Sequence, residues 1–184
     1  MIEWPTGKYK TILADPPWRY RDEKGKNPKL GGITYPTMSD AEILALPVAE
    51  KADADCMLCL WATMPKLPEA ISVIQAWGFR YVTCAFVWVK TYQDGRIYSG
   101  LGHWVNGNAE LMLLGRKGHP KRLRKNIKQI VLAPVGRHSQ KPEEVQDRIE
   151  QLFEGPYLEL FARRPRLNWD VWGNEVNNDE YYLN

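Results

Sequence analysis

Residues Lys10–Trp18, with the sequence KTILADPPW, predict a buried strand followed directly by a rigid turn. Residues 10–14 form an apolar run of strand length. Asp15-Pro16-Pro17 ends this run, because proline has no amide hydrogen to donate to a neighbouring strand. In parallel α/β sheets, ligands bind at the carboxyl ends of the strands. The turn that begins at Asp15 is therefore the first place to look for chemistry.

Strand and helix patterns alternate along the rest of the chain, on either side of a predicted loop over residues 19–37. Further strands are predicted at 56–62, 81–89, 109–114, 129–133 and 157–161. Helices are predicted at 39–46, where Ser39 is the N-cap, and at 66–77 and 142–153. This alternation predicts the α/β class: a mainly parallel, twisted sheet with helices on both faces.

Length and composition indicate one ordinary globular domain, with 184 residues, 44% hydrophobic and 26% charged. A net charge of +3 permits a polyanionic partner without requiring one. The odd number of cysteines and the lack of an N-terminal signal segment favour a reducing, cytoplasmic location. No apolar run approaches the ~20 residues that would cross a bilayer. Cys56 and Cys59 lie inside an apolar run without a second ligand pair, so they are predicted core residues, and no metal site is expected.

The turn Asp15-Pro16-Pro17-Trp18 contains the groups needed to activate an exocyclic base amine. The Asp15 carboxylate and the Pro16 carbonyl can each accept one amine hydrogen, which localises the nitrogen lone pair. The prolines fix φ near about −65° and make the turn rigid. Trp18 offers a flat face for a base taken out of its stack, worth about 1–3 kcal/mol. On these residues alone an adenine amine, a cytosine amine and a simple strand end all remain open.

The motif resembles the Asp/Asn-Pro-Pro-aromatic turn of amino-methyltransferases, and downstream segments resemble the MT-A70 family of adenine-N6 methyltransferases in its own order. These segments are 35–40 (YPTMSD), 102–110 (GHWVNGNAE), 138–144 (HSQKPEE), 159–163 (ELFAR) and 168–174 (NWDVWGN). The resemblance implies a single Rossmann-like methyltransferase domain in which the catalytic motif precedes the cofactor-binding strand. It also implies methyl transfer from S-adenosylmethionine to adenine N6 in nucleic acid.

The resemblance further implies roles for single residues. The catalytic residues would be Asp15, Pro16, Pro17 and Trp18. The cofactor-binding residues would be Asp15, His138, Lys141, Arg163, Asn174 and Glu175. Arg164 and Arg166 are equally basic, which leaves the position of the cofactor arginine ambiguous. Ile2 and Trp4 are the candidates for holding the cofactor's adenine.

A basic run between residues 116 and 128 contains seven Lys or Arg and no acid, which suits contact with phosphates, although a solvated loop is the alternative. The predicted substrate-binding residues are Tyr35, Trp104, Arg116, Lys117, Lys121, Arg122, Arg124 and Lys125. DNA is favoured over RNA because the chain has no zinc-finger extension. Methylation of RNA and a non-catalytic partner subunit are the alternatives, and both homo- and hetero-oligomers stay open.

Overall fold

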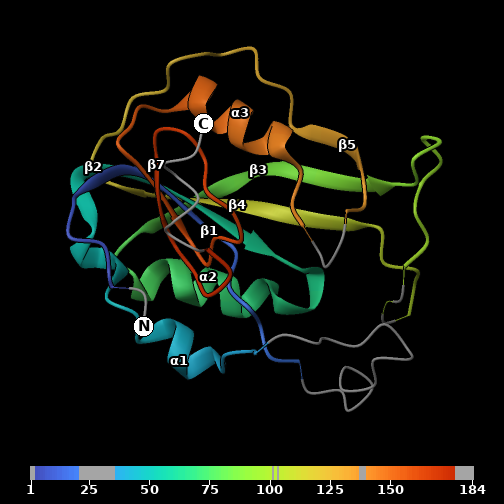
Figure 1. Ribbon diagram of the computed structural model, residues 1–184, viewed down its shortest axis with the longest axis horizontal. Helices are drawn as coiled ribbons and strands as arrows, with labels where there is room; N and C mark the ends of the chain where they lie inside the picture. Colours follow the sequence, from blue (N-terminus) through green and yellow to red (C-terminus); the bar gives the residue numbers. More distant parts are fainter. Residues whose placement is uncertain (1–2, 21–35, 101, 103, 137–139, 177–184) are drawn as a thin grey trace.

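The computed structural model describes residues 3–20, 36–100, 102, 104–136 and 140–176 (Figure 1). The elements in chain order are β1 (Tyr9–Ala14), α1 (Asp40–Leu44), η3 (Val48–Glu50), β2 (Ala52–Ala62), η4 (Met64–Lys66), α2 (Leu67–Ala76), β3 (Arg80–Thr91), β4 (Ala109–Lys117), β5 (Ile130–Pro134), α3 (Glu143–Leu152), β6 (Tyr157–Leu160) and β7 (Trp169–Trp172). The seven strands form one sheet in the order β5-β3-β4-β2-β1-β6-β7.

One strand of the sheet runs against the others. β4 pairs antiparallel with both β2 and β3. All other pairings, β1 with β2 and β6, β3 with β5, and β6 with β7, are parallel. Six strands thus share one direction, which confirms the mainly parallel sheet. β1 lies between β2 and β6, so the carboxyl ends of these three strands lie side by side.

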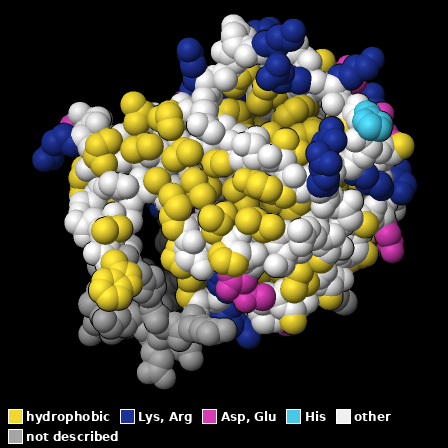
Figure 2. Space-filling model, turned by 180° about the vertical axis from the view of Figure 1, so that it is seen from behind, with side chains coloured by type: hydrophobic (Ala, Val, Ile, Leu, Met, Phe, Trp, Pro, Cys, Tyr) yellow, Lys and Arg dark blue, Asp and Glu magenta, His cyan; other side chains and the backbone are white. Residues whose placement is uncertain are grey.

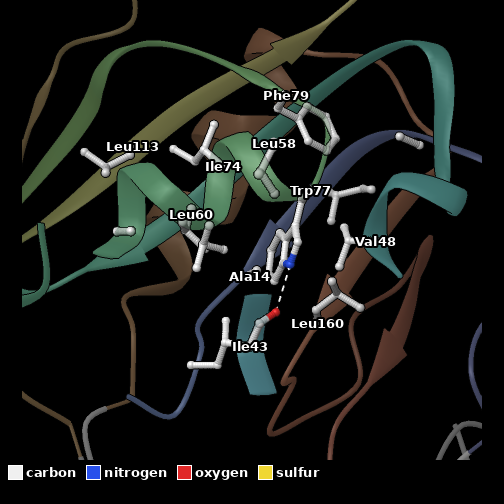
Figure 3. Close-up of a cluster of buried hydrophobic side chains, with 14 of the residues drawn as sticks. Ala14, Ile43, Val48, Leu58, Leu60, Ile74, Trp77, Phe79, Leu113 and Leu160 are labelled. Atoms are coloured by element: carbon white, nitrogen blue, oxygen red, sulfur yellow. Dashed lines mark hydrogen bonds between the residues drawn. The ribbon is translucent and has the colours of Figure 1, made fainter. Parts of the chain in front are cut away.

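Buried side chains fill both faces of the sheet. Leu58 and Leu60 of β2 point into one cluster, and Trp61 points into the other, because side chains alternate along a strand. α1 and α2 cover the first face and α3 covers the second (Figure 1). In the first cluster, the Trp77 indole donates a hydrogen bond of 3.0 Å to the carbonyl of Ile43, which joins α2 to α1 (Figure 3). The prediction of helices on both faces is confirmed.

β5 is an edge strand with one buried and one exposed face. Val131 and Ala133 pack in the cluster under α3, whereas Ile130 and Leu132 are 48% and 63% exposed. Figure 2 shows a broad apolar area on the back of the molecule, with Lys and Arg side chains around it. Because successive side chains of β5 point to opposite faces of the sheet, one set of them is buried and the other set is exposed to solvent.

Several element boundaries differ from the predicted ones. α1 is shorter than expected, because the capping box of Ser39 and Glu42 begins it and Pro47 limits its end. β2 begins four residues before the predicted start, because Asp53 and Asp55 interrupt the apolar pattern over its first residues, 52–55. β7 was not predicted as a strand. It has only four residues and pairs on one side with β6.

The cysteines of β2 are core residues, as predicted. Cys56 and Cys59 are free and fully buried, and burial raises the pKa of the Cys56 thiol to about 12. Both thiols are therefore neutral at ordinary pH and behave as small apolar side chains. Within the described part of the chain, no helix combines the length and apolarity that a membrane span requires.

Candidate active site

The carboxyl edge of the parallel strands brings together side chains from distant parts of the chain. Asp15 follows β1 directly, while Arg163 follows β6, the neighbouring strand. Lys141 precedes α3, which packs on the same side of the sheet as Trp61 at the end of β2. Since these elements end or begin at one edge, their functional groups meet there.

Four charged side chains of alternating sign form a row at this edge. The ammonium of Lys141 lies 2.8 Å from Asp15 Oδ2 and 3.2 Å from Glu110 Oε2. The other oxygen of Glu110, Oε1, lies 2.6 Å from Lys90 Nζ. The side chains of Lys141 and Glu110 are only 15% and 7% exposed. Each inner charge is thus neutralised by a neighbour on both sides, which is the condition under which buried charges are tolerated.

The row fixes the charge states of its members. Burial raises the pKa of Asp15, although Lys141 opposes this effect. Burial alone would lower the pKa of Lys141, but Asp15 and Glu110 outweigh it and raise the pKa above its ordinary value. Burial would also raise the pKa of Glu110, yet Lys141 and Lys90 outweigh it and lower the pKa. Lys141 therefore stays protonated and Glu110 ionised at neutral pH.

The backbone of the Asp15–Trp18 turn is held by hydrogen bonds on its carbonyls. The N–H of Trp18 donates to the Pro16 carbonyl, and the N–H of Met38 donates to the Pro17 carbonyl, both at 2.9 Å. A carbonyl oxygen has two lone pairs, so each can still accept one further hydrogen.

Trp18 is not an open platform. Its side chain is 4% exposed, and its indole donates to the Trp61 carbonyl at 3.3 Å. Beside it, the Tyr20 hydroxyl shares a hydrogen bond of 2.7 Å with Thr63 Oγ1. The turn after β1 is thus fastened to the end of β2 through two aromatic side chains.

Two cavities meet at Asp15, the first residue of this turn. The larger measures about 280 Å³, and its lining includes Gln146, Glu159, Phe161, Arg164 and Glu175. The smaller measures about 40 Å³, and its lining includes Pro16, Pro17, Trp18, Tyr20 and Glu110. The residues that line both are Asp15, Trp61, Lys141 and Arg163. The ion pair of Asp15 and Lys141 therefore belongs to the wall between them.

The ion pairs formed after β6 distinguish the three arginines that the sequence left as candidates for contacting the cofactor. Arg164 pairs with Glu143, and Arg166 pairs with two acids of α3. Arg163 lines both cavities, and its guanidinium lies 3.9 Å from the Glu175 carboxylate. Among the three arginines, only Arg163 is placed at both cavities.

The other residues predicted to contact cofactor or substrate fall into three groups. Asn174 is exposed and follows the strand next to Arg163, but the described lining contains Glu175 rather than Asn174. Trp4 packs edge-on against Trp172, with ring centroids 4.7 Å apart, and is likewise not part of that lining. Three residues lie outside the described residues: Ile2, Tyr35 and His138.

The basic run lies at the other edge of the sheet. β4 is antiparallel, so Arg116 and Lys117 at its end pair with the first half of β2, and the Lys117 ammonium donates to the carbonyl of Ala52. The following loop is fixed there by Leu123, whose N–H donates to the carbonyl of Leu152 at the end of α3. The substrate-binding candidates on this loop are the exposed Lys121, Arg122, Arg124 and Lys125, and Lys128 farther along it is exposed as well. The structure does not bring the basic residues of this run to the cavities.

Trp104 lies at the same edge as Asp15, in the loop between β3 and β4. Its side chain is fully exposed, and its φ of 68° places it in the left-handed region. No sequence motif assigned a role to Lys90, Glu110, Tyr20 or Glu159, which the structure places at or beside the cavities. For Lys90 and Glu110 a signal existed, because a charged residue at the end of an otherwise apolar strand indicates a buried charge partner.

The fold and the site together define a Rossmann-like methyltransferase. The MT-A70 family model matches residues 9–175, and the chain belongs to the MT-A70 family. The prediction from the sequence motifs is confirmed. Methyltransferases of this family use S-adenosylmethionine as the methyl donor, so the expected cofactor is confirmed as well.

Curated relatives extend the comparison. The chain is 32% identical to the Type II methyltransferase M.MunI of Mycoplasma sp, over 96% of this chain and 81% of that protein. It is 34% identical to the N(6)-adenosine-methyltransferase MT-A70-like protein of Drosophila melanogaster, over 93% of this chain and 27% of that protein. With the human N(6)-adenosine-methyltransferase catalytic subunit METTL3 it shares 32% identity, over 93% of this chain and 29% of that protein. The chain thus spans most of the first relative and less than a third of the other two.

Proposed function

We propose that this chain methylates the N6 amine of adenine in DNA, with the cofactor in the larger cavity and the amine of the target base at the smaller one. The observation that carries this proposal is the wall shared by the two cavities. Asp15 and Lys141 line both. A methyl transfer needs donor and acceptor on two sides of one small contact region, and the two cavities provide such an arrangement.

The larger cavity suits S-adenosylmethionine in size and charge. Its volume of about 280 Å³ is near the lower limit of ~300–1,000 Å³ for ligand pockets. The carboxylates of Asp15 and Glu159 can face the cofactor's positive groups, while Lys141 and Arg163 can pair with its carboxylate. The Glu175 carboxylate can accept hydrogen bonds from ribose hydroxyls. Bound there, the cofactor supplies a methyl group on a positively charged sulfur.

The smaller cavity provides acceptors for the amine. Asp15 and the remaining lone pair of a proline carbonyl can each accept one N6 hydrogen, which localises the nitrogen lone pair. The nitrogen then forms a bond to the methyl carbon while the carbon–sulfur bond breaks and sulfur keeps the electron pair. One N6 proton is released to solvent. Lys141 holds the Asp15 carboxylate in place, and its positive charge opposes the rise in the pKa of Asp15 that burial causes, which favours the charged, accepting form.

DNA is the polymer that the comparisons favour. The Type II methyltransferase M.MunI is matched over 81% of its length, whereas the human adenosine methyltransferase is matched over 29%. The chain therefore corresponds to most of a Type II methyltransferase and to only a part of the adenosine enzyme. RNA with the same base is the second candidate, because the identity to both relatives is 32%.

The test is a methylation assay with the purified chain, labelled S-adenosylmethionine, and unmethylated DNA or RNA of the same sequence. Nucleoside mass spectrometry is expected to find N6-methyl-2′-deoxyadenosine. Asp15→Asn should abolish this product, whereas Asp53→Asn, at the start of β2 on the opposite edge, should not. Methylated product only in RNA would contradict the proposal that DNA is the substrate. N4-methylcytosine as the product would contradict the proposal that adenine is the target base. The absence of any product together with the absence of cofactor binding by calorimetry would favour a non-catalytic partner subunit.

A further inference from the structure

The catalytic turn is paired with a short segment from beyond the loop that follows it. Met38 bridges to Trp18 in parallel fashion. Its N–H donates to the Pro17 carbonyl at 2.9 Å, and its carbonyl accepts from the N–H of Arg19 at 3.1 Å. The position of the Pro17 carbonyl and of the Trp18 backbone thus depends on where Met38 is held.

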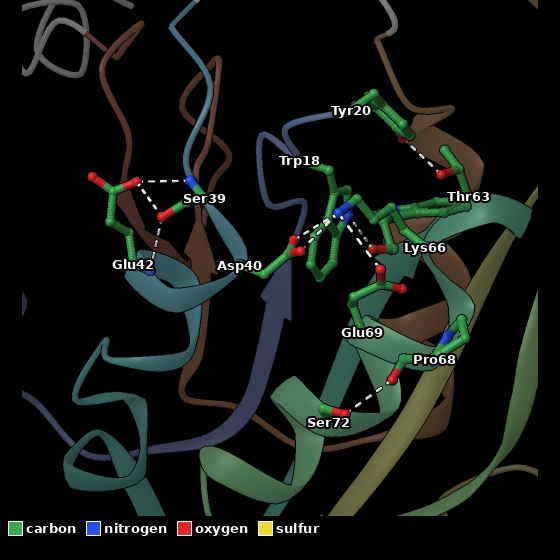
Figure 4. A network of polar contacts seen from close by, with 11 residues as sticks. Trp18, Tyr20, Ser39, Asp40, Glu42, Thr63, Lys66, Pro68, Glu69 and Ser72 are labelled. Atoms are coloured by element: carbon green, nitrogen blue, oxygen red, sulfur yellow. Dashed lines mark hydrogen bonds and ion pairs between the residues drawn. The ribbon is translucent and has the colours of Figure 1, made fainter. Parts of the chain in front are cut away.

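Met38 is held by the start of α1. Ser39 caps this helix and Asp40 is its first residue. The ammonium of Lys66 donates to both carboxylate oxygens of Asp40, at 2.7 and 2.9 Å, and lies 3.8 Å from Glu69 (Figure 4). α1 has five residues, so contacts with neighbouring elements fix its position; the Lys66–Asp40 ion pair is one of them, beside the burial of Ile43 and its hydrogen bond from Trp77.

Lys66 is anchored on the segment that also holds the aromatic side chains of the turn. Its N–H donates to the Thr63 carbonyl at 3.0 Å, and Thr63 Oγ1 bonds to the Tyr20 hydroxyl (Figure 4). Two residues before Thr63, the Trp61 carbonyl accepts from the Trp18 indole. These contacts form a closed ring. Backbone hydrogen bonds join the turn to Met38, the chain leads from Met38 to Asp40, and an ion pair joins Asp40 to Lys66. The segment that carries Lys66 is in turn hydrogen-bonded to Trp18 and Tyr20.

Burial makes this ion pair unusual. The Lys66 side chain is 8% exposed, although lysine is rarely buried without a partner. An apolar side chain would fill the same space without the cost of removing a charge from water. What the ion pair adds is direction, because an ammonium that contacts both oxygens of one carboxylate fixes that carboxylate relative to η4.

We propose that Lys66 and Asp40 are positioning residues for methyl transfer. They hold Met38, and through it the Pro17 carbonyl and Trp18, at the smaller cavity. Neither is among the described residues that line the two cavities, so their action is indirect. The inference rests on the proposed function in assigning the smaller cavity to the base. It predicts that replacing either residue lowers the efficiency of DNA methylation and leaves the affinity for the cofactor in the larger cavity nearly unchanged.

The experiment compares Asp40→Asn and Lys66→Met with the wild-type chain in steady-state methylation of DNA. Both variants should lower kcat/KM for DNA at least about 10-fold. The Kd for S-adenosylmethionine by calorimetry should change less than about twofold. The double variant should be no worse than the more damaged single variant, because both changes break one interaction. Lys66→Arg should recover part of the activity.

The matched control is Glu144→Gln, which breaks an ion pair of similar burial on α3. There the side chains of Arg148 and Glu144 are 16% and 50% exposed, compared with 8% and 39% for Lys66 and Asp40. This control should keep the wild-type kcat/KM. If Asp40→Asn and Lys66→Met also keep it while the wild-type chain methylates DNA, the inference is overturned and the proposed function stands. Equal losses of cofactor affinity, activity and melting temperature would overturn it too, because they indicate general damage.

A second measurement is independent of catalysis. Amide hydrogen exchange of Met38 and Trp18 should accelerate in Asp40→Asn, because both amides are hydrogen-bonded within the ring. The amide of Ala162, which bonds to Trp172 beside the larger cavity, should exchange as in the wild-type chain. Unchanged exchange at Met38 and Trp18 would overturn the inference even if the chain methylated no nucleic acid.

Discussion

Lys141 and Asp15 are 126 positions apart in the chain, yet the lysine ammonium lies 2.8 Å from the aspartate oxygen. The sheet order explains this contact. β1 is central and ends at Asp15, and the segment before α3 returns to the same edge. The pair is also one end of a row that continues through Glu110 to Lys90. The pKa of the Asp15 carboxyl therefore depends on Glu110, which lies two strands away from β1.

Replacement of Lys141 tests whether this lysine controls Asp15. Lys141→Met should lower kcat at least about 100-fold, because Asp15 loses the partner that orients it. Lys141 lowers the pKa of Asp15 and Glu110 raises it, so the pKa of Asp15 should rise further in the variant. The acidic limb of the pH–rate profile of residual activity should shift to higher pH. Lys141→Arg is the control and should show a smaller shift, whereas an unchanged profile in Lys141→Met would refute the coupling.

Glu110 and Lys90 should act on catalysis through Lys141. Glu110→Gln leaves Lys141 with Asp15 as its remaining carboxylate in the row, and we expect a loss in kcat of about 10-fold. Lys90→Met should cost less, because Lys90 contacts Glu110 and not Lys141 in the row. The effects should be non-additive in the double variant, since all three residues form one network. A double-mutant cycle in kcat measures this, and strictly additive effects would contradict the network.

Glu159 should make the stability of the fold depend on pH. Burial, and secondarily the charge of Asp15, raise the pKa of Glu159 from 4.5 to about 7, against the opposing effects of Gln146, Arg164 and Arg166. Below pH 4.5 the carboxyl is protonated in both folded and unfolded states. Between about 4.5 and 7 only the folded state keeps the proton, so the contribution to the free energy of unfolding falls as pH rises. Above about pH 7 the penalty is complete, at about 3 kcal/mol for a shift of this size.

Glu159→Gln separates this effect from others. Glutamine resembles the protonated carboxyl, and its oxygen can still accept the 2.8 Å hydrogen bond from Gln146. The variant should therefore be more stable than the wild-type chain at pH 8 and nearly equal to it at pH 5, as measured by denaturant unfolding. A gain at pH 5 as large as that at pH 8 would show that the charge of Glu159 is not its cause.

Local patterns predicted most of the fold. The apolar run of β1, the prolines after Asp15 and the capping residues of α1 are signals carried by neighbouring residues, and each appears near the expected position. β7 was missed because four residues at a sheet edge give little periodicity. The start of β2 was missed because Asp53 and Asp55 interrupt the apolar pattern.

The sequence predicted those site residues that lie within a short, recognisable motif. Asp15 and Lys141 were found through motifs in short segments. The row through Glu110 to Lys90 depends on which strands are neighbours, and strand order is not a local property. The direction of β4 is likewise non-local. Because β4 is antiparallel, the basic run that begins at Arg116 lies at the edge of the sheet opposite Asp15. The sequence shows the charges of this run but not its position.

The basic run and Trp104 lie at opposite edges of the sheet, so their contributions to DNA binding can be measured separately. Trp104 lies at the edge of the cavities and is fully exposed, so Trp104→Ala should weaken binding of a labelled duplex by about 5- to 150-fold, the range expected for one stacking contact of about 1–3 kcal/mol. The combined replacement of Lys121, Arg122, Arg124 and Lys125 by alanine should weaken binding less and leave its dependence on salt nearly unchanged. Fluorescence anisotropy at two salt concentrations measures both effects. A much shallower salt dependence in the fourfold variant would show instead that the duplex extends across the sheet to the opposite edge, because each lost phosphate contact removes about one unit of slope.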